Sequence, residues 1–302
     1  MNFTLIYGGD IRKNPGFTDK KAHKGYSRMA LTAQEYGFRM IKTSPQYVKK
    51  GVVTRYAIYN EAKDKWIKKR GKIRPGFILD KSRTVTESLA FKKELSFLCP
   101  GYINTMQMKL VCWDKMMTYL CFPEFMAKTY LLRHASEIDN ALSVIKGKRV
   151  VLKPLSGQGG EGVEILSPSA LRAKTSFKRP MILQSFINGS KGLPGFKHSS
   201  HDLRVVYVDN KPVQAYMRWP AKGKLVSNMT LGGIAEKIDL DDVPKGVWEI
   251  TKQVTKRFES FPLTFYSIDF MYHNRRKPVI VEINSNPGLL VHDHFSEPVY
   301  EL

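Results

Sequence analysis

The chain has 302 residues, of which 42% are apolar and 11% are aromatic, so it can bury a large core and form two or three compact units. This composition excludes a disordered chain. The sequence also excludes a membrane-spanning helix, because no apolar run approaches the ~20 residues that such a helix needs.

The first residues and the cysteines indicate the compartment. Met1–Tyr7 lacks the basic and then apolar form of a signal peptide, and is typical of a first β-strand. The three cysteines, Cys99, Cys112 and Cys121, have no Cys-x-x-Cys spacing, which disfavours a disulfide scaffold or a zinc site. We therefore expect a cytoplasmic protein.

The formal net charge of +22 is concentrated in the first third of the chain. Residues 1–100 hold 22 Lys and Arg against 8 Asp and Glu, a balance of +14, whereas residues 101–302 hold 27 against 19, a balance of +8. The densest stretch is Lys63–Arg74. Such a surface either only keeps the protein soluble or docks an acidic partner, namely an acidic peptide, a carrier protein or a nucleic acid. Specific nucleic-acid recognition has no supporting motif in the sequence.

The first hundred residues predict a small α/β unit. Gly8-Gly9 and Gly37 end its first strand and its helix. The expected strands are Phe3–Tyr7, Phe38–Thr43, Val52–Tyr59 with Lys63–Arg74 as its hairpin partner, and Pro75–Asp80, and the expected helix is Ser27–Tyr36.

Two further units are expected, over residues 101–183 and 184–302. The first of them is expected to contain a helix at Trp113–Leu120 and a strand at Val150–Lys153, with a return strand at Gly162–Leu166. The second is rich in strands, expected at Asp202–Val208, Pro212–Trp219, Phe265–Tyr272 and Pro278–Ile283, with a helix over Pro244–Phe261.

A glycine-rich stretch follows the strand that ends at Lys153. Glycines lack Cβ, so the backbone N–H groups of Gly157–Gly162 can approach phosphate oxygens, and Lys153 can supply a positive charge to the same phosphates. The alternative is an ordinary hairpin beside a surface lysine. The expected order of strand, loop and strand argues against a Walker P-loop or a Rossmann fingerprint, which both need a helix after the glycines.

A second group of polar residues lies on the last two expected strands. Glu282 and Asn284 are two residues apart and so face the same side of a strand, and Asp269 lies in an otherwise apolar strand. Two carboxylates and an amide carbonyl suit Mg²⁺, which would offset the cost of burying them. The alternative is that both carboxylates pair with Lys or Arg.

Together these motifs resemble those of the ATP-grasp superfamily, in particular the ribosomal-protein glutamate ligases, glutathione synthetases and endospore-coat-associated ATP-grasp proteins. The matching motifs follow the family order over about residues 100–290. The resemblance implies an α+β protein with an ATP-grasp fold, in which two α+β subdomains clamp ATP, preceded by the small basic α/β domain of residues 1–100.

The resemblance also implies roles for individual residues. Nucleotide binding falls to Lys115 and Lys153 at the phosphates, to the lid loop of Gly157, Gln158, Gly159, Gly160 and Gly162, and to the adenine hinge of Gln184, Ser185, Phe186 and Ile187. Catalysis falls to Arg204, Arg218 and Asn228, and metal binding to Asp269, Glu282 and Asn284. The cofactors implied are ATP and two Mg²⁺ ions, for which Mn²⁺ can substitute.

The function implied is that of an ADP-forming ligase, which joins a carboxylate to an amine through an acyl-phosphate. The basic N-terminal domain suggests an acidic peptide or carrier protein as acceptor, and a homo-oligomer is compatible with the sequence. Two alternatives stay open: a small-molecule ligase of secondary metabolism, and a non-catalytic ATP-binding structural protein of the coat type.

Overall fold

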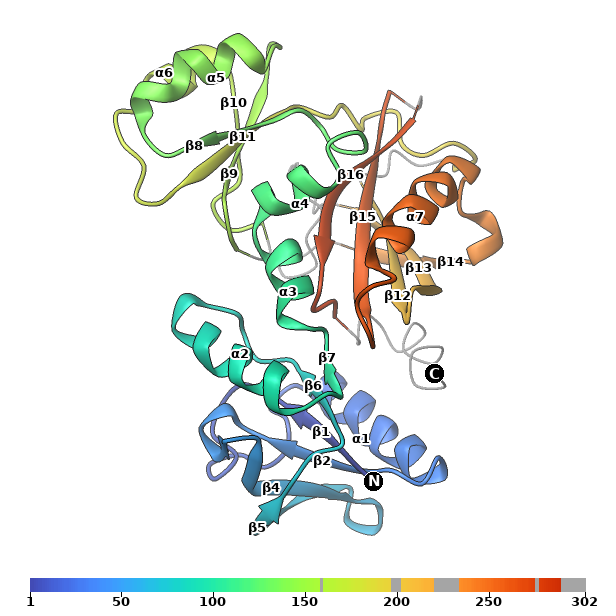
Figure 1. The fold of residues 1–302 in the computed structure, drawn as a ribbon. Helices are drawn as coiled ribbons and strands as arrows, with labels where there is room; N and C mark the ends of the chain where they lie inside the picture. The colour runs from blue at the N-terminus through green and yellow to red at the C-terminus, as the bar shows by residue number, and fades with distance from the viewer. Residues whose placement is uncertain (158–159, 197–201, 220–233, 275–276, 289–302) are drawn as a thin grey trace.

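The computed structural model describes residues 1–157, 160–196, 202–219, 234–274 and 277–288. In these ranges three β-sheets, of seven, four and five strands, follow one another along the chain (Figure 1), and each is the centre of one body. Their mixture of helices and sheets confirms the predicted α+β class. None of the helices in the same ranges is long and apolar enough to cross a membrane.

The first sheet lies at the bottom of Figure 1. Its strands are β1 (Asn2–Ile6), β2 (Arg39–Thr43), β3 (Val48–Lys49), β4 (Val52–Asn60), β5 (Lys65–Ile73), β6 (Phe77–Asp80) and β7 (Tyr102–Ile103), in the order β3-β4-β2-β1-β6-β7 with β5 paired to β4. The four strands β2, β1, β6 and β7 run parallel, so their carboxyl ends meet at one edge. The short helices η1 (Pro45–Tyr47), η2 (Glu61–Lys63) and η3 (Thr86–Ser88) complete this body together with helices α1 (Lys20–Glu35) and α2 (Leu89–Leu98).

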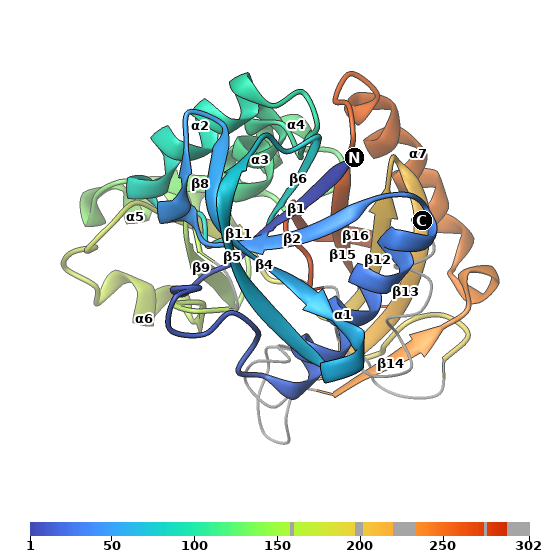
Figure 2. The same cartoon turned by 90° about the horizontal axis from the view of Figure 1, so that it is seen from below.

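Helix α1 (Lys20–Glu35) begins earlier than the sequence predicted. The side chain of Asp19 accepts hydrogen bonds from the backbone N–H groups of Lys21 and Ala22, which caps the first turn. Ala22, Tyr26 and Ala30 recur at a spacing of four residues and are buried. Figure 2 shows α1 beside the strands of the third sheet, and its residues share one core with Val206 and Tyr216 of that sheet.

The second sheet contains the predicted strand, loop and strand. Its antiparallel strands are β8 (Thr129–Leu132), β9 (Val150–Pro154), β10 (Glu164–Leu166) and β11 (Met181–Ser185), in the order β10-β9-β11-β8. Helices η4 (Ala135–Glu137), α5 (Ile138–Val144) and α6 (Pro168–Arg172) connect them. Leu132, Leu152 and Leu183 pack against Ala141 and Leu171 of α5 and α6 to form its core.

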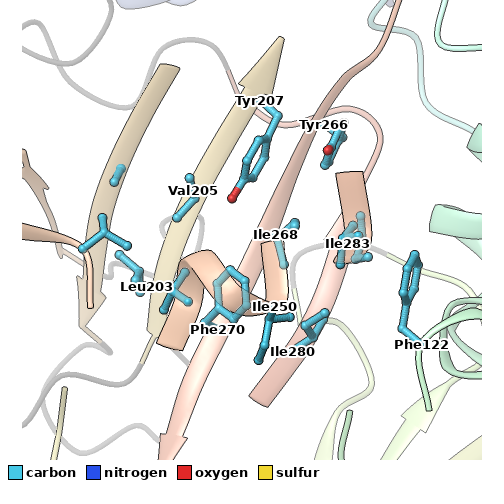
Figure 3. Packing of buried hydrophobic residues seen from close by; sticks show 14 of the residues in the cluster. Phe122, Leu203, Val205, Tyr207, Ile250, Tyr266, Ile268, Phe270, Ile280 and Ile283 are labelled. Atoms are coloured by element: carbon cyan, nitrogen blue, oxygen red, sulfur yellow. The ribbon is translucent and has the colours of Figure 1, made fainter. Parts of the chain in front are cut away.

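The third sheet has one apolar face and a second face, called the polar face below, on which charged residues at one end adjoin apolar residues that pack with α1. Its antiparallel strands are β12 (Asp202–Val208), β13 (Lys211–Trp219), β14 (Ile234–Ile238), β15 (Phe265–His273) and β16 (Lys277–Asn284), in the order β14-β13-β12-β15-β16, with η6 (Leu240–Asp242) and α7 (Lys245–Phe258) between β14 and β15. Figure 3 shows the apolar face, where Leu203, Val205 and Ile268 lie near Ile250 of α7. Because side chains alternate along a strand, the intervening residues point to the opposite face.

Helix α4 (Lys115–Cys121) confirms the helix predicted from Trp113 to Leu120, and a second short helix that was not predicted, α3 (Met106–Trp113), precedes it. Asp114 separates them, because its side chain accepts hydrogen bonds from the N–H groups of the first turn of α4. Met108, Cys112 and Phe122 belong to the core of the third sheet. Both helices therefore pack on the third sheet, although they precede the second in sequence.

The domain limits expected at residues 100 and 184 do not coincide with the limits of the sheets. β7 lies beyond residue 100 and pairs with β6, and β11 continues through residue 184 while it pairs with β8 and β9. Pairing with distant strands sets these limits, and a single sequence does not show which strands pair. The first sheet thus extends to Ile103 and the second to Ser185.

Asn104 joins the first body to the third. Its side-chain amide accepts a hydrogen bond from Phe265 N at 2.6 Å and donates to Phe265 O at 2.6 Å and to Ser285 O at 2.7 Å. Asn104 is completely buried. It therefore ties the start of β15 to the segment that follows β16.

Replacing Asn104 by alanine should destabilise the protein by about 2–4 kcal/mol, because it leaves buried backbone groups of Phe265 and Ser285 without partners. Urea unfolding measures this loss. The control is Asn140→Ala, at an exposed position of α5, which should change stability by less than about 0.5 kcal/mol. Equal stabilities of the two variants would contradict the role given to Asn104.

Candidate nucleotide and metal site

The polar face of the third sheet carries four of the predicted site residues, Arg204, Arg218, Asp269 and Glu282. Asp202, at the start of β12, lies on the same face. Strand register places Asp202 opposite Arg218, and Arg204 opposite Asp269. Asp269 in turn lies directly opposite Glu282. The strand order β13-β12-β15-β16 therefore places these side chains in two adjacent rows, Arg218 with Asp202 and Arg204 with Asp269 and Glu282.

Two guanidinium groups bind the carboxylate of Asp269. Arg204 donates to it through Nε and Nη2, at 2.6 and 2.7 Å, and Arg218 Nη2 donates to Oδ2 at 2.6 Å. Arg218 also forms two bonds of 2.6 and 2.7 Å with Asp202. Burial raises the pKa of Asp269, but the two arginines outweigh it and lower the pKa to about 2. The carboxylate is thus ionised and fixed in place at neutral pH.

The sequence left two explanations for the carboxylates, a metal ion or pairing with basic residues, and the structure contains the pairing. The contacts from Arg204 and Arg218 occupy three of the about four lone-pair positions of the Asp269 carboxylate. Glu282 lies 3.7 Å from the amine of Lys115, measured from Oε1 to Nζ. Asp269 is therefore held by a tight network, whereas Glu282 has a single loose partner among the described residues.

The donor atoms nevertheless fit a hard divalent cation. Glu282 is 29% exposed, and the Oδ1 atom of Asn284 accepts only a bond from Asn286 N, at 2.9 Å, among the described contacts. Ser267 lies opposite Asn284, and its buried hydroxyl has no hydrogen-bond partner in the described part of the chain. Carboxylate, amide and hydroxyl oxygens are the ligands that such cations prefer.

Lys115 connects the metal candidates to the glycine-rich loop. It begins helix α4, and its Nζ atom donates to Gly157 O at 3.0 Å while it lies near Glu282. Its backbone N–H donates to Leu155 O at 2.9 Å, which attaches the start of the helix to the end of β9. The amine therefore lies between the loop and the carboxylate, where the sequence expected a phosphate contact.

Lys153 lies in the second sheet and points toward the same region. Its Nζ atom donates to Gln184 Oε1 at 2.9 Å, and Gln184 Nε2 donates to Thr129 Oγ1 at 3.0 Å. Burial lowers the pKa of Lys153 to about 8, although Glu282 raises it, and Lys115 lowers it further. The Lys153 amine is therefore near enough to Lys115 and Glu282 for their charges to shift its pKa.

Part of the predicted lid loop lies within the described residues. Gly157, Gly160 and Gly162 have φ values of 146°, 73° and 74°, in the region that favours glycine. A Cβ atom at Gly162 would lie 2.9 Å from Pro154 Cγ, which is too close. Gln158 and Gly159 lie outside the described residues, as does the predicted catalytic residue Asn228.

The predicted adenine hinge follows β11. Ser185 ends that strand, and its N–H group donates to Lys128 O at 2.9 Å. The Arg149 guanidinium lies 4.2 Å from the centre of the Phe186 ring, and Ile187 is buried. The hinge therefore leads from the second sheet to the third, beside the Gln184 side chain that holds Lys153.

The sequence analysis missed a buried polar cluster at the carboxyl end of β6. Asp80 accepts hydrogen bonds from Lys92 Nζ at 2.5 Å and from Tyr102 OH at 2.6 Å, and the side chains of Asp80 and Lys92 are completely buried. Burial raises the pKa of Asp80, but Lys109 and Lys92 outweigh it and keep the pKa below its usual value. The cluster fixes the edge of the first sheet that faces the third.

Lys81, the next residue, extends from that edge to the site. Its Nζ atom donates to Pro287 O, just after β16, and lies 5.7 Å from the centre of the Phe265 ring. Burial and the nearby charges of Lys109 and Arg204 lower the pKa of Lys81 to about 7. The charge of Asp80 acts in the opposite direction but is outweighed. The sequence did contain a signal for this cluster, namely Asp80 and Lys81 at the end of a buried strand. Ligands of open α/β sheets bind at the carboxyl ends of such strands.

The fold is that of ATP-grasp proteins. The structure is similar to that of the ATP-grasp ligase PsnB complexed with a phosphomimetic variant of a minimal precursor, Mg and ADP, with a TM-score of 0.63. The similarity covers 99% of this chain and 95% of that chain at 10% sequence identity, so it shows the fold alone. The predicted ATP-grasp architecture is thereby confirmed.

The family is also defined. Residues 114–287, more than half of the chain, match the model of the prokaryotic glutathione synthetase ATP-grasp domain, and the chain belongs to this family. A glutathione synthetase of Prochlorococcus marinus subsp. pastoris is 28% identical over 167 residues, which are 53% of this chain and 50% of that protein. A probable alpha-L-glutamate ligase of Chromohalobacter salexigens is 28% identical over 158 residues, 51% and 47%. The chain spans about half the length of these relatives.

Two of the predicted metal ligands should differ in their effect on stability. Asp269→Ala should destabilise the protein by about 3–5 kcal/mol, because it leaves buried guanidinium groups without their partner. Glu282→Gln should change stability by less than about 1 kcal/mol, because the side chain is 29% exposed and its lysine partner is 3.7 Å away. Urea unfolding of both variants measures the difference, and equal losses would contradict the network described for Asp269.

The lowered pKa of Lys153 predicts a pH dependence of nucleotide binding. The amine is charged below its pKa of about 8 and becomes neutral above it, so the affinity for metal-free ADP should fall as pH rises through about 8, by up to about tenfold per pH unit. Calorimetric titration measures this fall. Lys153→Arg keeps its charge in this range and should bind ADP with little change. A fall of the same size in both proteins would assign the titration to another group.

Proposed function

We propose that the chain is an ATP-dependent carboxylate–amine ligase that forms an amide bond through an acyl-phosphate. The observation that carries the proposal is the convergence of Lys115, Lys153 and Glu282 from three different elements on one end of the polar face. Two amines beside a carboxylate match the charges of a nucleotide phosphate chain and its cation. An isolated structural ion pair would not need the second amine.

ATP binds between the second and third sheets in this account. Lys115 and Lys153 neutralise the phosphate oxygens, and the backbone of the loop from Gly157 to Gly162 approaches them closely because its glycines lack Cβ. Gln184 holds the Lys153 amine at 2.9 Å and so keeps it on the nucleotide side of β9. Adenine lies against the hinge of Ser185, Phe186 and Ile187.

Glu282, Asn284 and Asp269 would hold Mg²⁺, and we propose two such ions, for which Mn²⁺ could substitute. When bound, the metal neutralises charge that builds up on the β- and γ-phosphates. Glu282 is free to turn from Lys115 to the ion, because their contact is loose. Asp269 contributes through its remaining lone pair or through water, because Arg204 and Arg218 retain the others.

The reaction has two steps. A substrate carboxylate oxygen attacks the γ-phosphorus and ADP leaves; the amine then attacks the acyl carbon, and phosphate leaves with the bonding electrons as the amine loses a proton. Arg218, fixed by Asp202, and Asn228 bind the transferred phosphoryl group, and Arg204 stabilises the oxyanion of the tetrahedral intermediate. The glycine loop closes over the acyl-phosphate and excludes water.

The acceptor is an amine carried by an acidic peptide or a carrier protein. The net charge of +14 in residues 1–100 supports this class of acceptor, since this part of the chain contains 22 basic and 8 acidic residues. The two alternatives are a small-molecule acceptor and ATP binding without turnover. The following experiment distinguishes both of them from the proposal.

Hydroxylamine replaces the unknown amine and traps an acyl-phosphate as a hydroxamate. With MgATP, hydroxylamine and a fractionated cell extract as the source of carboxylate, the protein should release ADP and hydroxamate in equal amounts. Glu282→Gln and Lys153→Ala should reduce ADP release by at least about 10²-fold, because each removes charge that stabilises the transition state. Lys146→Ala, at an exposed position before β9, is the control and should keep full activity.

Two results would contradict the proposal. ADP release at the wild-type rate by both site variants would remove Glu282 and Lys153 from the chemistry. ATP binding without ADP release in every fraction would instead indicate a non-catalytic ATP-binding protein. The mass of the hydroxamate identifies the carboxylate. Reactions in which amino acids or peptides replace hydroxylamine then identify the amine.

A further inference from the structure

Strand β5 forms an outer rim of the first sheet. Among the described strands it pairs only with β4, so one of its edges carries backbone N–H and C=O groups that β4 does not bind (Figure 1). The pairing runs without interruption from Lys65 opposite Asn60 to Arg70 opposite Arg55, and becomes irregular beyond that point. The regular part of this edge, Lys65–Arg70, spans about 20 Å.

This edge is basic on both sides of the strand. Lys65 and Lys69 alternate with Lys68 and Arg70, so each side of the strand carries two of them. All four are exposed, and residues 65–74 contain no acidic residue. A peptide strand added beside β5 would therefore lie next to positive charge on both of its faces. A run of consecutive acidic residues in an extended chain matches this pattern.

Other partners match the edge less well. A second copy of β5 would place lysines opposite lysines, which is destabilising. A single-stranded nucleic acid needs exposed aromatic rings for stacking. The one tryptophan of β5, Trp66, is 3% exposed and donates to Ser27 Oγ at 3.2 Å, and neighbouring Tyr59 donates to Asp64 at 2.8 Å. The charge and the strand geometry together favour an acidic peptide.

The edge is also linked to the candidate site. Lys68 Nζ donates to Arg12 O at 2.5 Å, and Arg12 lies in the loop that follows β1. That loop belongs to the carboxyl edge of the parallel strands, from which Lys81 extends to Pro287 beside the metal candidates. A peptide bound along β5 would thus lie on the body whose carboxyl edge faces the site.

We propose that the Lys65–Arg70 edge of β5 binds a consecutively acidic, extended segment of the acceptor as an additional β-strand. The inference rests on the proposed function, because it gives the binding mode of the acceptor. Backbone hydrogen bonds supply affinity for any extended chain, and the four basic side chains select acidic ones.

The test uses a fluorescein-labelled peptide of about ten consecutive Asp and Glu residues, long enough to cover the six-residue edge. Its binding to the full-length protein is measured by fluorescence anisotropy. A second peptide of the same sequence carries an N-methyl group on every backbone nitrogen of its central six residues, which keeps its charge and removes the donors of both strand edges. We expect the N-methylated peptide to bind at least about tenfold more weakly. Equal binding of the two peptides would show attraction by charge alone and would overturn the proposal.

Variants locate the peptide. The triple change Lys65→Glu, Lys69→Glu and Arg70→Glu leaves the Lys68 contact intact and should weaken binding at least about tenfold. The matched control changes three exposed lysines elsewhere, Lys146, Lys148 and Lys252, to Glu and should bind within about twofold of the wild type. Equal weakening in both proteins would contradict a site on β5, as would tighter binding of a single-stranded oligonucleotide to the same edge.

The two proposals fail in different ways. The β5 variant should keep wild-type ADP release with hydroxylamine, which does not need docking, whereas Lys153→Ala should lose ADP release and still bind the acidic peptide. ADP release without peptide binding would overturn the docking proposal alone. Peptide binding without ADP release in any extract fraction would overturn the ligase proposal and leave an acidic-peptide-binding protein.

Discussion

The carboxylate of Asp269 is shared by the guanidinium groups of Arg204 and Arg218 in the interior of the third sheet. Buried charges are costly unless they are paired, so these three side chains and Asp202 are held as a unit. The unit sets the position of one end of the polar face. At the other end Glu282 is partly exposed and loosely paired, which leaves it available to a cation. The carboxylate on β15 is thus held rigidly, whereas the carboxylate on the neighbouring strand β16 can bind a cation.

Alternation along the strands makes this division compatible with folding. On one face, Leu203, Val205 and Ile268 pack against α7 and supply the hydrophobic stabilisation of the third body (Figure 3). On the other, residues from the other two bodies cover the charged side chains. The second supplies Lys153, and the first supplies Asn104 and Lys81 from the carboxyl edge of its parallel strands. The candidate site therefore exists only where the three sheets meet.

Much of this could be predicted from local sequence patterns. The limits of β12 agree with the alternation of apolar residues, and a spacing of two residues places Glu282 and Asn284 on one face. The pairing of Asp269 with Arg204 and Arg218 could not be predicted, because it depends on β12 lying between β13 and β15. The same is true of the hydrogen bonds from the Gln184 side chain to Lys153 and Thr129. Long-range strand order is absent from a single sequence.

Above all, we propose that the polar face of the third sheet binds a metal and a nucleotide together. Crystals grown with ADP and Mn²⁺, measured at a wavelength where Mn²⁺ scatters anomalously, locate the ion directly. We predict an anomalous peak within about 2.5 Å of oxygen atoms of Glu282 and Asn284, with the ADP phosphates between that peak and the amines of Lys115 and Lys153. A nucleotide bound elsewhere, or Glu282 still paired with Lys115 and no ion beside it, would contradict the account.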